Sequence, residues 1–84
     1  MPLPKQPVTL TVEQIDELNQ KLATMRHDIN NHLSLIVAAM DLLRYKPQMA
    51  EQMRVTLLEQ PAQINESLKK FSREFEGTFG ITRP

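Results

Sequence analysis

The chain has 84 residues, of which ten are Lys or Arg and ten are Asp or Glu, so its formal net charge is zero. A chain of this length forms one small domain whose hydrophobic core is marginal by itself, and pairing with a second copy is a common remedy. The balanced charge excludes the clustered basic excess of a nucleic-acid-binding protein, and the absence of cysteine excludes disulfides and thiolate metal sites.

No segment of the sequence has the character of a membrane span or a secretion signal. The longest uncharged run, residues 29–40, is too short to cross a bilayer and contains Asn and His. The first ten residues carry prolines in place of an apolar stretch, so no signal peptide is predicted. We therefore expect a cytoplasmic protein with no membrane insertion and no nucleic-acid partner.

Residues 1–10 are expected to form an extended leader, because they contain three prolines. Thr11 has the character of a helix N-cap, and Gln14, three residues later, completes a capping box. No Gly or Pro follows until residue 47. The sequence therefore predicts one long helix over residues 11–45.

The apolar residues of this predicted helix recur every seven positions. The first heptad position holds Ile15, Leu22, Ile29, Ile36 and Leu43. The position three residues later holds Leu18, Met25, His32 and Ala39. Five consecutive heptads indicate the packing of a coiled coil or helical bundle.

Pro47 ends the first pattern and is well placed to begin a second helix, predicted over residues 47–76. Gly77 is expected to cap that helix at its C-terminus, which leaves residues 77–84 as a flexible tail. Pro61 lies inside the second helix and is expected to kink it or to split it. The apolar stripe of this segment consists of Met49, Met53, Leu57, Ile64, Leu68, Phe71 and Phe75.

Two long helices joined by a short turn predict an antiparallel helical hairpin over residues 11–76. A two-helix hairpin cannot cover a wide apolar stripe from both sides. We therefore expect an all-α fold in which two hairpins pair into a homodimeric four-helix bundle.

A polar segment stands in the middle of the first helix and reads Arg26-His27-Asp28-Ile29-Asn30-Asn31-His32-Leu33. With Ile29 at the first heptad position, His27 lies opposite the seam and is expected to be exposed. Asp28 and Asn31 lie beside it, and Asp28 is expected to hold one ring nitrogen of His27 as a donor. An exposed imidazole with a neighbouring carboxylate and amide suits nucleophilic or proton-transfer chemistry near neutral pH.

The run from His27 to Leu33, with an apolar continuation that ends at Leu42-Leu43, resembles the H-box of sensor histidine kinases. In that family the H-box lies on the first helix of the dimerization and histidine-phosphotransfer domain, a helical hairpin that dimerises into a four-helix bundle. The resemblance covers residues 26–43 by motif and residues 11–76 by architecture.

The resemblance implies a role for individual residues. His27 matches the phosphoacceptor of the family, and Asp28 matches the acidic neighbour that acts as general base and orients the ring. Asn31 matches the residue that positions water when the domain dephosphorylates a receiver domain, and Arg26 is a candidate phosphate contact. His32 stands where the family commonly has proline, so the helix is expected to run straighter and the bend associated with kinase switching is in doubt.

The resemblance also implies partners. These are a second copy of the chain, a response-regulator receiver domain that carries Mg²⁺, and a histidine kinase or ATP-binding domain acting in trans. Nothing after Glu76 is similar to the family's ATP-binding domain, so no autonomous kinase activity is expected. The chain is then a kinase fragment or a stand-alone hairpin, and its proline-rich start and its tail favour the second.

No cofactor and no metal are expected on this chain. His27 and His32 are five residues apart and fall on different helix faces, whereas ligands on one face need a spacing of four. Two function classes stay open. One is a phosphotransfer or phosphorelay module with receiver phosphatase activity, and the other is a non-catalytic dimerisation or scaffolding hairpin with a relic H-box. Two consecutive asparagines, poor helix formers in mid-helix, favour the first.

Overall fold

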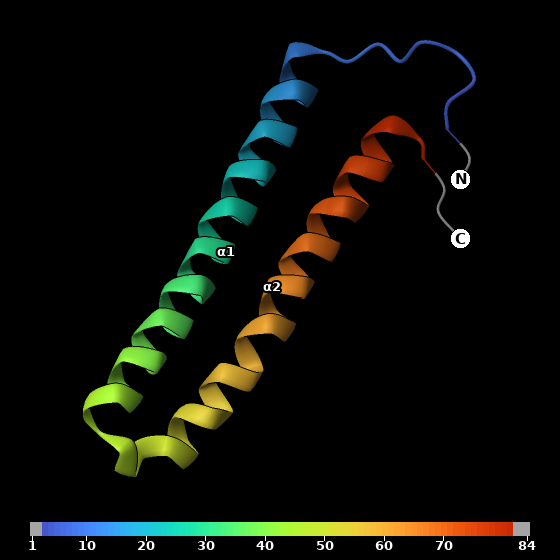
Figure 1. The fold of residues 1–84 in the computed structure, drawn as a ribbon. Coiled ribbons are helices and arrows are strands. Elements are labelled where there is room, and N and C mark those ends of the chain that lie inside the picture. The colour runs from blue at the N-terminus through green and yellow to red at the C-terminus, as the bar shows by residue number, and fades with distance from the viewer. Residues whose placement is uncertain (1–2, 82–84) are drawn as a thin grey trace.

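The computed structural model describes residues 3–81, which form two antiparallel helices joined by a short turn (Figure 1). Helix α1 spans Val12–Tyr45 and helix α2 spans Ala50–Phe79, with a 3₁₀ turn, η1, over Pro47–Met49 between them. Residues 3–81 contain no strand. The all-helical fold expected from the heptad pattern is confirmed, and the two helices lie side by side as a hairpin.

The start of α1 has the reciprocal hydrogen bonds of a capping box. The backbone N–H of Gln14 donates to Oγ1 of Thr11 at 3.1 Å, and the backbone N–H of Thr11 donates to Oε1 of Gln14 at 2.8 Å. These bonds satisfy two backbone donors that the first turn of a helix leaves without partners. Residues 3–10, ahead of this cap, form no helix.

The turn between the helices is dictated by Pro47. Lys46, the residue before it, has φ −135° and ψ 74°, because a following proline disfavours helical backbone angles. The N–H of Lys46 still donates to the carbonyl of Leu42 at 2.7 Å, which completes the last turn of α1. Pro47 then opens η1 at a position where its missing N–H has no intrahelical partner to lose.

The C-terminus of α2 lies three residues beyond the predicted one. Gly77 is inside the helix, so the prediction that it caps the helix and that a tail starts there is wrong. The cap is Gly80, whose φ of 67° lies in the left-handed region that favours glycine. The N–H of Ile81 donates to the carbonyl of Glu76 at 2.9 Å, the six-to-one bond of a Schellman motif. Residues 82–84 of the predicted tail lie outside the described residues.

Helix α2 continues through Pro61 without interruption (Figure 1), so the alternative in which this proline splits the helix is wrong. Proline removes a single backbone donor, the one that would serve the carbonyl of Leu57. The residues around it, Leu57, Gln60 and Ile64, are partly or fully buried in the hairpin. Contact with α1 on both sides of the proline holds the helix together across the missing bond.

The hairpin is a single layer of helices. The principal extents of the chain are 58 × 28 × 12 Å, and the small third extent agrees with one layer of helices. Within the described residues, Ala39 and Gln60 alone are buried, and no large side chain is fully buried. The apolar side chains along the seam are therefore covered from one side only.

Candidate functional site

The register of α1 against α2 decides which parts of the polar segment, residues 26–33, meet the second helix. The partly buried residues of α1 follow the two heptad rows predicted for the seam, from Leu18 and Leu22 onward. A third row flanks the seam on one side and contains Lys21, Asp28, Leu35 and Leu42. We call this side of the hairpin the H-box face.

The opposite side of the hairpin is apolar and uncovered. On α1 it carries Leu33, Val37 and Met40, and on α2 it carries Leu58, Pro61 and Leu68. All six side chains are exposed, up to 67% for Leu58. We call this side the apolar face.

His27 is exposed on the outer edge of α1, away from α2 and between the two faces. It makes no hydrogen bond or ion pair within the described residues. Both ring nitrogens are therefore open to an incoming group. The predicted exposure of this imidazole is confirmed.

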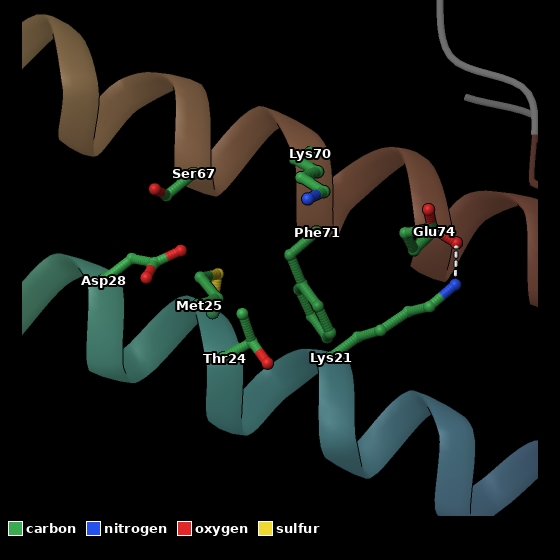
Figure 2. Close-up of a pocket in the computed structure, with 8 residues that line it drawn as sticks. All are labelled: Lys21, Thr24, Met25, Asp28, Ser67, Lys70, Phe71 and Glu74. Atoms are coloured by element: carbon green, nitrogen blue, oxygen red, sulfur yellow. Dashed lines mark hydrogen bonds and ion pairs between the residues drawn. The ribbon is translucent and has the colours of Figure 1, made fainter.

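Asp28 turns toward α2, not toward His27. Its side chain is partly buried and lines a hollow together with Ser67 and Lys70 of α2 (Figure 2). Neighbouring residues of a helix do not face each other, because each is rotated by about 100° from the last. The expected bond from the imidazole to this carboxylate is absent from the structure, and the role of Asp28 as general base stays a prediction.

Asn31 and Arg26 are both exposed, but they lie on different sides of His27. Asn31 follows His27 by four residues, which places it one turn along on the same side of α1. Arg26 shares its heptad row with Leu33 and Met40 and so borders the apolar face. The structure thus brings His27 and Asn31 to one exposed surface, with Asp28 beside them in the hollow and Arg26 on the opposite flank.

His32 lies in the seam, as its heptad position predicts, and its partner there is Gln60. Nδ1 of His32 and Oε1 of Gln60 are 2.6 Å apart. Because an amide oxygen only accepts, Nδ1 carries the proton. Gln60 was missed by the hydrophobic pattern because it is polar, although it completes the 3–4 spacing of Met53, Leu57 and Ile64 that marks the α2 side of the seam.

An ion pair links the two helices at one end of the hollow. Nζ of Lys21 lies 2.6 Å from Oε2 of Glu74 and 3.2 Å from Oε1 of Glu17 (Figure 2 shows the first). The hydrogen bond to Glu74, and to a smaller extent the one to Glu17, raises the pKa of Lys21. The bond from Lys21 lowers the pKa of Glu74. All three groups are more than a third exposed, so water and salt screen the pair.

No known protein family, curated protein or solved structure matches this chain. Neither α1 nor α2 is apolar enough over its length to cross a membrane. Among residues 3–81, no three His, Asp or Glu side chains cluster in a way that could hold a metal ion. These comparisons therefore assign the chain to no family.

Proposed function

We propose that this chain is a phosphotransfer module of two-component signalling and that His27 is its phosphoacceptor. The observation that carries the proposal is the exposure of His27 on the outer edge of a long, uninterrupted helix, where it has no competing bond. Asn31 stands one turn away on the same side, as the H-box pattern requires. The proposal implies a cytoplasmic protein.

The chemistry needs position and charge from the protein and no cofactor on this chain. A ring nitrogen of His27 attacks the phosphorus of a receiver's aspartyl phosphate, an N–P bond forms, and the aspartate leaves as a carboxylate. Mg²⁺ on the receiver neutralises the phosphoryl oxygens during the transfer. Asp28 assists when its side chain rotates out of the hollow and accepts the proton of the other ring nitrogen.

The same site can work in either direction. A histidine kinase or an ATP-binding domain in trans would load His27, which then passes the phosphoryl group to a receiver as in a phosphorelay. In the phosphatase direction, the amide of Asn31 would hold a water molecule against the receiver's aspartyl phosphate. Water is the nucleophile in that step alone, so Asn31 matters there and not in transfer.

The proposed module is a homodimeric four-helix bundle, and the surface area of the hairpin supports this. The chain exposes 6720 Å², whereas a compact monomer of its mass exposes about 5,100 Å². The exposed, non-helical residues 3–9 account for part of this excess, and the one-layer hairpin, whose apolar face a second copy could cover, accounts for the rest.

The apolar face is the surface we assign to the dimer contact. Pro61, Ile64 and Leu68 line a shallow hollow there that can receive side chains of a second copy. Burial of this face leaves the H-box face and the outer edge with His27 open to a receiver. The proposed dimer and the proposed phosphoacceptor are therefore compatible.

The test is transfer of labelled phosphate from a phosphorylated receiver or a partner kinase, with Mg²⁺ present. We expect wild type to take up acid-labile phosphate and His27→Ala to take up none while keeping its circular dichroism spectrum, because no packing is lost at an exposed site. Asn31→Ala should accept phosphate at the wild-type rate and slow the hydrolysis of receiver phosphate.

Uptake of acid-labile phosphate by His27→Ala would overturn the assignment of the acceptor. No uptake by wild type from any kinase or receiver of the host would favour the alternative, a dimerisation or scaffolding hairpin with a relic H-box. The exposed apolar face is compatible with that function as well, since scaffolding needs the bundle contact alone.

A further inference from the structure

The hollow beside Asp28 is a feature that the proposed phosphotransfer does not use. It opens on the H-box face between α1 and α2 and has a volume of about 200 Å³. Its walls are formed by Lys21, Thr24, Met25, Asp28, Ser67, Lys70, Phe71 and Glu74. Figure 2 shows the side chains of Met25 and Phe71 between the polar groups of its two ends.

The charges around this hollow fall into two groups. Lys21 and Glu74 satisfy each other through their ion pair. Asp28 and Lys70 line the same hollow from opposite helices, and neither makes a hydrogen bond or a contact ion pair within the described residues, although the charge of Lys70 helps to lower the pKa of nearby Glu74. The hydroxyls of Thr24 and Ser67 donate no hydrogen bond there either.

An unpaired carboxylate and an unpaired ammonium on one small hollow complement a ligand that carries both charges. We propose that the hollow binds a small zwitterion, namely a free α-amino acid with an apolar side chain. The ammonium group of the ligand would pair with Asp28 and the hydroxyl of Ser67, and its carboxylate would pair with Lys70. The apolar side chain would lie against Met25 and Phe71.

The size of the hollow agrees with this class of ligand. Its volume of about 200 Å³ is below the range of about 300–1,000 Å³ typical of pockets for drug-sized ligands. Charge-assisted bonds to the ammonium and carboxylate groups of the ligand would supply orientation, and the apolar wall would supply selectivity against glycine. Because the hollow opens on the H-box face, the proposed dimer leaves it accessible.

Binding at this site does not depend on the proposed phosphotransfer, but its consequence for His27 does. A bound ammonium group would hold Asp28 in the hollow and keep it from the neighbouring imidazole. The ligand would then slow phosphorylation of His27.

The experiment is an NMR titration of the full chain, which follows backbone amide shifts as L-leucine is added to millimolar concentration. We expect saturable shifts near residues 24–28 and 67–71. Isoamylamine lacks the carboxylate of leucine, isocaproate lacks the ammonium, and glycine lacks the side chain. Isoamylamine and isocaproate should each bind at least about tenfold more weakly, which is the effect of losing one charge-assisted contact. Glycine should also bind more weakly, because it loses the apolar contact with Met25 and Phe71.

Variants of residues inside and outside the hollow distinguish binding in the hollow from binding elsewhere on the surface. Asp28→Asn and Lys70→Gln should each weaken leucine binding by about tenfold or more. Lys69→Gln should leave it unchanged, because Lys69 is exposed and does not line the hollow. Absence of saturable shifts with L-leucine would overturn the proposal, and so would equal binding of isoamylamine or isocaproate. Phosphate is not involved in any of these measurements, so the outcome is independent of the phosphotransfer test.

Discussion

Gln60 is the most deeply buried polar side chain within the described residues, at 7% exposure, and it lies in the middle of an otherwise apolar seam. Its hydrogen bond with His32 satisfies both groups. A slip of one helix along the other would separate the two and leave each without a partner. The pair therefore favours one register of the hairpin, much as a single polar residue does in a coiled coil.

We expect Gln60→Leu or His32→Leu alone to lower the free energy of unfolding by about 1–3 kcal/mol, because each change leaves the other polar group in the seam without a hydrogen-bond partner. The double variant should recover most of that loss, since two apolar side chains leave nothing unsatisfied. Urea unfolding of all four proteins measures the coupling. Two single losses that simply add in the double variant would show that the pair does not act as a unit.

The ion pair of Lys21 and Glu74 predicts a pH dependence of stability. The bond from Lys21 lowers the pKa of Glu74 in the fold, so its stabilising effect is present above the ordinary carboxyl pKa and is lost as the pH falls through the lower pKa of the folded state. The pKa of Lys21 is raised, so its effect is present at neutral pH and is lost only in strong alkali.

Glu74→Gln should therefore lower Tm slightly at neutral pH, and its difference from wild type should disappear in acid. Glu66→Gln is the control, because Glu66 is exposed and makes no ion pair. Thermal melts across the acidic range, at low and high salt, measure both variants. A Tm difference for Glu74→Gln that stays constant with pH would contradict the prediction.

At the scale of the helices, the two glycines of α2 have opposite roles. Gly77 lies inside the helix, and a Cβ added there would meet no atom within 4 Å. Gly80 has space as well, but its φ of 67° is a conformation that side chains with a Cβ rarely adopt. The two sites therefore differ in backbone conformation and not in packing.

Gly77→Ala should raise the free energy of unfolding by about 0.5–1 kcal/mol, because alanine loses less conformational freedom than glycine in a helix. Gly80→Ala should lower it by about 1–2 kcal/mol, because the left-handed cap becomes strained. Thermal or urea unfolding followed by circular dichroism tests both. If both changes shifted stability in the same direction, the assignment of the cap to Gly80 would be wrong.

At the scale of the whole molecule, the one-layer hairpin leaves its apolar face without a partner. Val37 is 60% exposed at the centre of that face, and Leu35, 48% exposed, lies on the H-box face of the same helix. The two residues have similar exposure and opposite placement. They form a matched pair for testing which face carries the proposed dimer contact.

Val37→Glu should convert the dimer to a monomer at micromolar concentration, because dimerisation would bury an unpaired carboxylate. Leu35→Glu should leave the dimer intact. Sedimentation gives the mass, and melts at several protein concentrations show whether stability depends on assembly. A wild-type chain that sediments as a folded monomer would overturn the proposed dimer. If Leu35→Glu dissociated the dimer and Val37→Glu did not, the dimer contact would lie on the H-box face.

Much of the hairpin follows from local rules that the sequence carries by itself. The capping box of Thr11 and Gln14, the end of α1 before Pro47 and the seam position of His32 all depend on neighbours within one or two turns, so the pattern of residues determines them. The exposure of His27 follows in the same way, because the helical period alone places it opposite the seam.

The tertiary structure decided what depends on the second helix. Gly77 and Gly80 are equally suitable caps in sequence, and the helix continues to Gly80 with Thr78 and Phe79 partly buried against the rest of the hairpin. Gln60 is polar, so no hydrophobic pattern marks it, and its burial depends on His32, 28 residues away. Asp28 turns toward Ser67 and Lys70 because α1 and α2 together form a hollow beside it. The hollow depends on the register of the two helices, which neither sequence segment determines alone.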